Sequence, residues 1–237
     1  MGLTDEQLKF ANHPNDAFVQ ACPGAGKTRT VVARLAQVAR SLPPRKGVAM
    51  LSFTNTAVDE FAARCQQDGL DRLTAFPSFV GTFDAFVRHF LVLPSGIEGV
   101  AVRPTIVDSW EAMGVEIRLA APNSYRGGGV LSLDRFDPST NTINPIAIAR
   151  ADLRQHVQAN QDQYQQVASY RRRRLRGAGF LSAADTRVEA LQRLRSAAWS
   201  EALSHALAAR FHELIVDEAQ DCNPLDLQIL AWLRGSG

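Results

Sequence analysis

The chain has 237 residues, of which 46% are hydrophobic, so it can bury a core and is not a disordered tail. Its net charge of +2 neither predicts nor excludes a nucleic-acid partner. It contains no run of about 18 apolar residues and no basic leader followed by an apolar stretch. These absences argue against a membrane span and a signal peptide and predict a cytoplasmic protein.

The cysteine and lysine contents are both low. The three cysteines show no CxxC spacing and lie far apart, at Cys22, Cys65 and Cys222. We therefore predict unpaired, mostly buried thiols rather than a zinc site. Only three of the 26 basic residues are lysines, at Lys9, Lys27 and Lys46. In a chain that otherwise uses arginine, each lysine is more informative.

The first 90 residues alternate between strand-like and helix-like segments. Residues 4–7 have the T-x-x-Q form of a capping box and predict the start of a short helix. Three short apolar runs are predicted strands, at residues 17–21, Gly47–Ser52 and residues 79–80. Helical patterns follow them, at Lys27–Ser41, Asn55–Gln67 and residues 83–93. This alternation predicts a parallel sheet with both faces covered by helices.

The middle of the chain has a different character. Residues 94–149 are rich in Pro, Gly, Ser and Asn, whereas residues 150–175 and 182–209 are strongly helical. Residues 211–217 (FHELIVD) return to a short buried strand, and Pro224 begins a last helix. The pattern predicts an α/β core, made of residues 1–93 and 210–237, interrupted by a mostly helical insertion at residues 94–209.

The segment ACPGAGKT, residues 21–28, fits the phosphate-binding P-loop pattern with an alanine in place of the first glycine. Gly24 and Gly26 permit a backbone whose N–H groups point at phosphates, at the positive end of the following helix. Lys27 adds a charge for the β and γ phosphates, and the Thr28 hydroxyl is placed for Mg²⁺. The alternative is a Gly-rich turn in which GKT occurs by chance.

A second chemical signal is an acidic pair. In LIVDEAQD, residues 214–221, an apolar strand delivers two carboxylates at its end. Asp217 is the candidate holder of Mg²⁺, and Glu218 is the candidate activator of a water for attack on the γ phosphate. The alternative is an acidic helix start favoured by the helix dipole.

These motifs, in this order, resemble the UvrD/Rep/PcrA family of superfamily 1A DNA helicases over most of the chain. LTDEQ resembles the family's Q motif, in which Gln7 would read the adenine edge; alternatively, Gln7 only closes the capping box. VDEAQD resembles motif II, in which Gln220 would help couple DNA binding to hydrolysis, and the resemblance places the catalytic residues at Lys27, Glu218 and Gln220. The resemblance implies a RecA-like P-loop NTPase fold that takes ATP and Mg²⁺. It places ATP-binding residues at Gln7, Ala21, Cys22, Pro23, Gly24, Ala25, Gly26, Lys27, Thr28 and Arg29.

The same resemblance implies a site for single-stranded DNA. LSFTNTAVDEF, residues 51–61, resembles motif Ia, in which Phe53 would stack on a base while Thr54 and Asn55 would contact phosphates. The alternative for Phe53 is a core aromatic. GTFDAF, residues 81–86, resembles the family's GTFHSF, with Asp84 in place of the histidine. The matching DNA-binding positions there are Thr82 and Phe83.

Residues 95–170 show little resemblance at the level of motifs. RGAGFLSAAD, residues 176–185, is only loosely similar to a G-x-DFDDL segment of the family. It follows a run of basic residues at Arg171, Arg172, Arg173, Arg174 and Arg176. The run either contacts DNA phosphates or is a solvated helix end, and the sequence leaves both open.

The resemblance implies an ATP-dependent DNA helicase or translocase, a hydrolase that couples ATP hydrolysis to binding of single-stranded DNA or a single-strand/duplex junction. The family's later motifs and second motor domain are not among these 237 residues, so an N-terminal part of the motor is expected, with that domain as a partner. One alternative is a nucleotide-switched DNA-binding module without helicase activity. Another, a P-loop kinase, is not expected to carry FTNTA and GTFDAF.

Overall fold

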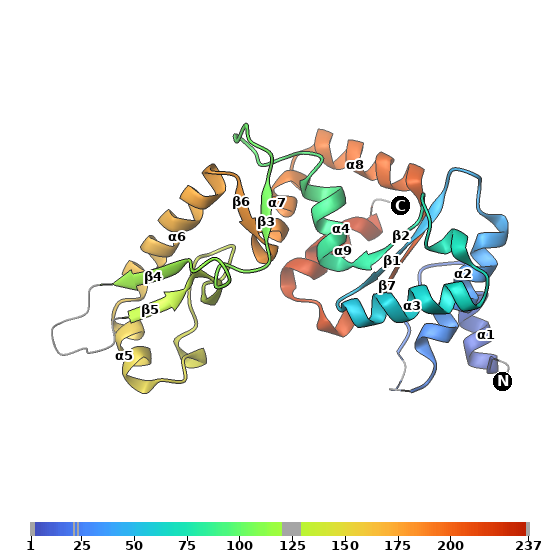
Figure 1. Cartoon of the computed structure of the whole chain (residues 1–237), viewed down its shortest axis with the longest axis horizontal. Coiled ribbons are helices and arrows are strands. Elements are labelled where there is room, and N and C mark those ends of the chain that lie inside the picture. The colour runs from blue at the N-terminus through green and yellow to red at the C-terminus, as the bar shows by residue number, and fades with distance from the viewer. Residues whose placement is uncertain (1–2, 21, 23, 120–128, 236–237) are drawn as a thin grey trace. The chain divides into compact units, whose positions relative to one another are not determined.

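A computed structural model describes residues 3–20, 22, 24–119 and 129–235 (Figure 1). The chain divides into two compact units. Unit 1 contains residues 1–86 and 197–237, and unit 2 contains residues 87–196. Among the described residues no helix is both long and apolar enough to cross a membrane. No disulfide joins the three cysteines; Cys65 is buried, Cys22 is exposed and Cys222 is half-buried, so the prediction of mostly buried thiols holds only for Cys65.

Unit 1 is built on a small parallel sheet. Its described strands are β1 (Gly47–Ser52), β2 (Phe79–Thr82) and β7 (Phe211–Val216), in the order β2-β1-β7. Every residue of β1 is buried, as expected for a central strand covered on both faces. Met50 of β1 aligns with Val80 of β2 and with Ile215 of β7. The predicted α/β class with a parallel sheet is confirmed.

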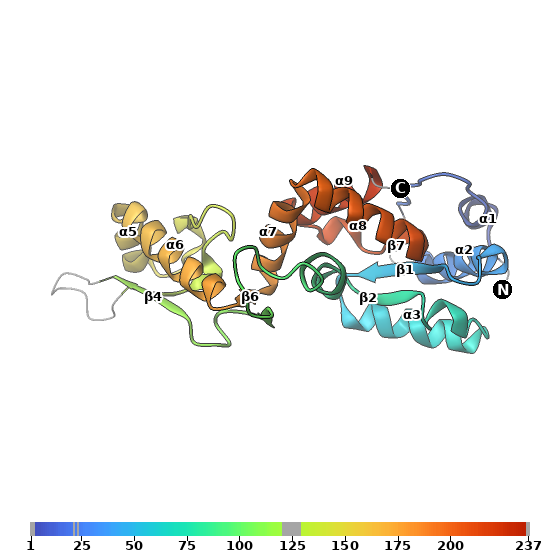
Figure 2. The ribbon, with the colours of Figure 1, turned by 90° about the horizontal axis from the view of Figure 1, so that it is seen from above.

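Helices cover both faces of this sheet. Figure 2 shows α3 (Asn55–Gln67) on one side of the sheet and α8 (Ala197–Arg210) with α9 (Pro224–Gly235) on the other. Beside α3, α2 (Lys27–Ser41) contributes the buried Leu35 to a core that also contains Phe61. The remaining elements of unit 1 are α1 (Asp5–Ala11), α4 (Phe83–Phe86) and the 3-10 turns η1 (Asp71–Leu73) and η5 (Ala219–Asp221).

One predicted strand is wrong. Residues 17–20 form no strand, and Ala21, the last residue of that prediction, lies outside the described residues. The apolar side chains that favoured a strand are not packed against the sheet, since Phe18 is 86% exposed and Val19 is 48% exposed. The central strand β1 also offers them no edge, because β2 and β7 occupy both of its sides.

Unit 2 combines helices with two small sheets that the sequence pattern did not predict. In one sheet β3 (Thr105–Val107) pairs in parallel with β6 (Phe180–Ser182), and in the other β4 (Glu116–Leu119) pairs antiparallel with β5 (Gly129–Ser132). The other elements are the π-helical η2 (Val87–Val92), η3 (Leu133–Arg135), η4 (Pro145–Ala147), α5 (Ala151–Ala159), α6 (Gln161–Gly177) and α7 (Ala183–Leu194). Trp110, Phe136 and Tyr164 are fully buried in its core.

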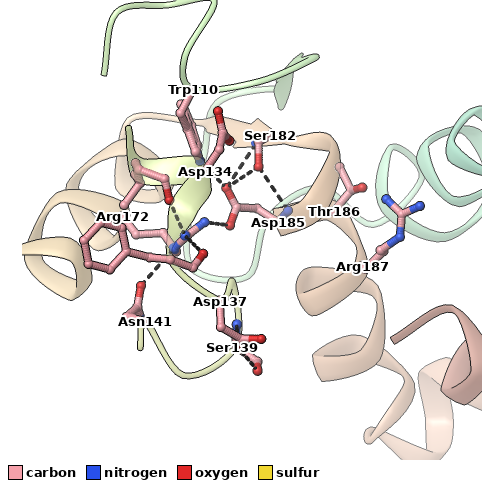
Figure 3. A network of polar contacts seen from close by, with 12 residues as sticks. Trp110, Asp134, Asp137, Ser139, Asn141, Arg172, Ser182, Asp185, Thr186 and Arg187 are labelled. Atoms are coloured by element: carbon pink, nitrogen blue, oxygen red, sulfur yellow. Dashed lines mark hydrogen bonds and ion pairs between the residues drawn. The ribbon is translucent and has the colours of Figure 1, made fainter. Parts of the chain in front are cut away.

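A buried polar network joins α6 to α7 in unit 2 (Figure 3). Arg172 forms an ion pair with Asp185 and donates to the Asn141 side chain at 2.9 Å. Asp185 also accepts from the Trp110 indole at 2.8 Å and closes a capping box with Ser182. One turn further along α6, Arg176 makes two bonds, of 2.8 and 3.1 Å, with Glu189, which is 2% exposed. Two arginines of the basic run therefore hold buried carboxylates.

Candidate functional site

The P-loop backbone turns through two glycines in the left-handed region. Gly24 has φ 79° and Gly26 has φ 78°, values that L residues with a side chain rarely adopt. A Cβ on Gly26 would also lie 3.2 Å from the Gln7 side chain. The Ala25 N–H donates to the Cys22 carbonyl at 3.1 Å and tightens the turn. Ala21 and Pro23, also predicted to bind ATP, lie outside the described residues.

Gly26 is the N-cap of α2, and its conformation sets the start of that helix. Among the described residues no side chain caps this N-terminus, and the first turn contains no acidic residue. Its N–H groups and positive dipole end are therefore available to an anion. Lys27, Thr28 and Arg29 form the first turn, and all three are half-buried.

The acidic pair lies at the end of β7, close to this turn. The Asp217 N–H donates to the Leu51 carbonyl at 2.8 Å, which extends the pairing of β7 with β1 by one residue. Glu218 adopts φ 55° and ψ 40°, an uncommon conformation for a residue other than glycine. The Lys27 ammonium bonds the Glu218 carboxylate, and the Gln220 amide donates to it from the other side. Glu218 therefore contacts both of the other predicted catalytic residues.

This arrangement shifts the ionisation of the site. The hydrogen bond that Lys27 donates to Glu218 raises the pKa of Lys27, and the same bond, with a second donated by Gln220, lowers the pKa of Glu218. Burial, and then the charge of Glu218, raises the pKa of Asp217. The pair Lys27–Glu218 is thus charged near neutral pH, whereas ionised Asp217 lies in an environment that disfavours its charge.

The residues expected to hold Mg²⁺ have the right chemistry for it. Thr28 offers a hydroxyl oxygen and Asp217 a carboxylate, both hard oxygen donors of the kind Mg²⁺ prefers. Across the described ranges no group of three His, Cys, Asp or Glu side chains could hold a metal by itself. Mg²⁺ is usually bound through one or two protein oxygens together with nucleotide phosphates and water, and Thr28 and Asp217 could supply those protein oxygens.

Gln7 connects α1 to the P-loop. Its side-chain oxygen accepts from the Thr4 N–H at 2.9 Å, and Thr4 accepts in return from the Gln7 N–H, so the predicted capping box is confirmed. Its side-chain nitrogen donates to the Ala25 carbonyl at 2.9 Å. Gln7 therefore both closes the box and lies against the phosphate-binding loop.

The predicted DNA-binding residues gather at the ends of β1 and β2. Phe53 follows β1, and its ring stacks on the Phe83 ring with centroids 5.4 Å apart and planes 20° apart. Phe83 is fully buried, whereas Phe53 is half-buried, so only Phe53 presents part of its ring at the surface. The exposed Thr54 and Asn55 begin α3, where Thr54 accepts from the Ala57 N–H at 3.2 Å. Thr82 lies opposite Ser52 in the strand register.

Sequence patterns did not identify one further ion pair in unit 1. Arg34 of α2 bonds Glu213 of β7 at 2.5 Å, although 179 residues separate them. No spacing rule connects such distant positions. The only available signal was the charge of Glu213 in a strand predicted to be buried, where a charge requires a partner.

Comparison with known families gives one match. The model of the UvrD/REP helicase N-terminal domain matches residues 3–109 and 131–237. The matched ranges include the P-loop, the residues at the ends of β1 and β2, and the acidic pair. No curated protein matches the chain.

Proposed function

This chain belongs to the UvrD/REP helicase family, and from that premise we propose that it is the ATP-binding motor core of a DNA helicase or translocase. In this role ATP hydrolysis is coupled to the binding of single-stranded DNA or a single-strand/duplex junction. The observation that carries the proposal is the contact of Lys27, Glu218 and Gln220 beside an uncapped helix N-terminus at a P-loop.

The proposed division of labour follows from the chemistry of each group. The N–H groups at the start of α2 and the ammonium of Lys27 bind the phosphates. Thr28 and Asp217 would hold Mg²⁺, which would supply positive charge to offset that of the phosphates. Glu218 accepts a proton from the attacking water, and Gln220 orients the Glu218 carboxylate through its hydrogen bond.

The ion pair between Lys27 and Glu218 implies an exchange of partners when ATP binds. In the free chain each group neutralises the other, so Glu218 is occupied as an acceptor. A γ phosphate competes for Lys27 because it carries more negative charge than one carboxylate. Transfer of Lys27 to the phosphate frees Glu218 to accept from a water. In this scheme, binding of nucleotide prepares the base for catalysis.

The DNA site is proposed at the adjoining strand ends. Phe53 stacks on a base, with the buried Phe83 as its support, while Thr54, Asn55 and Thr82 contact the sugar-phosphate backbone. β1 ends in this site and also pairs with β7, which ends in the acidic pair. A displacement of β1 on DNA binding would therefore reach Asp217, whose N–H bonds Leu51. This is the proposed route of coupling.

We also propose that the α/β core is RecA-like, with a boundary near residues 93 and 210 and a second motor domain as its partner. The support is the parallel order β2-β1-β7 with a P-loop helix beside it. The compact units divide slightly earlier on each side, after residues 86 and 196.

The first test is ATP hydrolysis by the purified chain, measured as phosphate release with and without single-stranded DNA. We expect Lys27→Ala to abolish hydrolysis. Lys46→Ala should leave hydrolysis unchanged, because Lys46 precedes the first residue of β1, whereas the proposed site lies at the other end of that strand. The second candidate function is a nucleotide-switched DNA-binding module. Tight ATP binding that changes DNA affinity without any hydrolysis would favour that candidate and overturn the first.

A further inference from the structure

Arg34 of α2 makes several polar contacts with other parts of unit 1. Its side chain is only 14% exposed, and its guanidinium bonds the Glu213 carboxylate of β7 at 2.5 Å. The same group donates to the His13 carbonyl at 2.5 Å and to the Phe10 carbonyl at 3.3 Å, and lies 5.7 Å from the centre of the Phe10 ring. One side chain therefore holds together α2, β7 and the end of α1.

The helix α1 depends on such external contacts. It has seven residues, which is too short to be stable without tertiary packing. Arg34 bonds the carbonyls of Phe10 and His13 at the C-terminal end of α1, where the dipole favours a cation. Gln7, in the middle of α1, bonds the P-loop at Ala25. The anchor at Arg34 is therefore one of the contacts that hold α1, and with it Gln7, beside the P-loop.

Glu213 holds the Arg34 guanidinium in place. Side chains alternate along a strand, so Glu213, Ile215 and Asp217 share one face of β7. Ile215 packs against the core that contains Leu35 of α2. The Arg34 guanidinium is thus held by the strand that ends in the acidic pair. Without Glu213, a mostly buried cation would lose its charge partner, which strongly disfavours its position.

The described hydrogen bonds of Gln7 use only some of the donors and acceptors of its side-chain amide. An amide has two N–H donors and an oxygen with two lone pairs, and the contacts with Thr4 and Ala25 use one of each. Among the described residues, these contacts leave one donor and one acceptor, in the plane of the amide. Adenine offers a matching acceptor and donor on its N7 and N6 edge, whereas guanine offers two acceptors there.

We propose that Arg34 is a positioning residue for base recognition: by anchoring α1 to Glu213 of β7, it holds the Gln7 amide where it distinguishes adenine from guanine. The inference rests on the proposed ATP-binding function and extends it to the choice of base. Arg34 contributes to the affinity for the base and not to the affinity for the phosphates, which the P-loop holds by itself.

The test is a competition experiment on the full 237-residue chain with Mg²⁺, in which ATP, GTP and inorganic tripolyphosphate each displace a fluorescent ATP analogue. The wild type should prefer ATP to GTP by roughly tenfold, about the value of one well-placed hydrogen bond. Arg34→Gln should weaken ATP by a similar factor and bring the ratio of ATP to GTP affinity close to one. The tripolyphosphate affinity should stay within about twofold, as expected for a site that the substitution does not touch.

Matched variants separate positioning from folding. Arg40→Gln changes an exposed arginine of the same helix and should leave all three affinities unchanged. Glu213→Gln keeps the shape of the partner and should reproduce the loss of base preference, and it serves as the test if Arg34→Gln does not fold. Arg34→Lys, which keeps the charge without the planar fork, should recover part of the preference.

Different results would contradict the proposed ATP-binding function and the inference about Arg34. If the wild type does not bind ATP, or if Lys27→Ala does not weaken binding, the proposed function fails. If ATP binds but Arg34→Gln weakens ATP and tripolyphosphate equally, Arg34 only supports the fold and the inference is overturned. The inference is also overturned if both Arg34→Gln and Glu213→Gln retain the wild-type preference for ATP.

Discussion

The Lys27 ammonium and the Glu218 carboxylate are bonded to each other, although one belongs to the P-loop and the other to the end of β7, 191 residues later. The two groups with the most direct proposed roles in hydrolysis therefore begin as one neutral pair. Because each group also has its own proposed role, we expect substitutions of Lys27 and of Glu218 to affect nucleotide binding and hydrolysis differently.

Glu218→Gln should separate nucleotide binding from hydrolysis. The amide keeps the size of the side chain but removes the charge that holds Lys27, so Lys27 is released more easily to a phosphate. We expect equal or tighter ATP binding in an equilibrium titration. Phosphate release should fall by roughly 100-fold or more, the usual contribution of a general base. Weaker ATP binding by this variant would contradict the exchange of partners.

The dependence of stability on pH tests the same pair. Hydrogen bonds from Lys27 and Gln220 lower the pKa of Glu218 below its ordinary value of 4.5. A depressed pKa means that the stabilisation is present above the unfolded pKa and is lost as the pH falls through the folded pKa. The unfolding-temperature difference between wild type and Glu218→Gln should therefore stay constant from about pH 7 to about pH 5 and shrink below that. The difference should be small, because the Glu218 side chain is 28% exposed and solvent screens the pair.

Asp217→Asn should stabilise the free chain while abolishing its activity. Burial and the charge of Glu218 raise the pKa of Asp217, so at neutral pH its ionised form opposes folding. Asparagine removes that cost but also removes the carboxylate proposed for Mg²⁺. We expect a higher unfolding temperature without nucleotide and no rise on addition of Mg²⁺ and ATP, whereas the wild type should show a rise. A lower unfolding temperature in the free variant would contradict this explanation.

Phe53 and Phe83 should respond in opposite ways to substitution. Phe53→Ala removes the half-buried ring proposed to stack on a base, worth about 1–3 kcal/mol in DNA binding with a smaller effect on folding. Phe83→Ala removes a fully buried ring and should cost about 3–5 kcal/mol in stability. Fluorescence anisotropy with labelled single-stranded DNA and urea unfolding measure the two effects. Phe76→Ala, at a ring that is 84% exposed, is the control.

Local sequence patterns predicted the parts of the structure that depend on neighbouring residues. The capping box at Thr4 and Gln7 and the helix after Gly26 formed as expected, because propensity, capping and spacing agree there. The strand expected at residues 17–21 did not, because a strand also needs a partner and a packed face, which local patterns do not report.

These local patterns did not predict contacts between residues that lie far apart in the sequence. The resemblance implied that Lys27 and Glu218 serve the same ATP site but predicted no bond between them, and the charge of Glu213 in a predicted buried strand did not identify Arg34 as its partner. The basic run shows the same limit. Its alternatives were DNA contact or solvation, but Arg172 and Arg176 bind carboxylates of α7 instead. Helical spacing of four residues places both on one face of α6, yet only the fold supplies the carboxylates opposite.

Arg172→Met should therefore destabilise the protein far more than Arg173→Met. Arg172 is 11% exposed and pairs with Asp185, which is 5% exposed, whereas Arg173 is an exposed neighbour on the same helix. Removing one partner of a buried pair leaves an uncompensated charge and costs about 3–5 kcal/mol, while an exposed substitution stays within about 0.5 kcal/mol. Adding Asp185→Asn to Arg172→Met removes the stranded charge and should recover part of the loss, although Ser182 and Trp110 then bond a weaker acceptor. Urea unfolding followed by circular dichroism measures all of these variants. Equal stability of the two single variants would show that the Arg172–Asp185 pair does not stabilise unit 2.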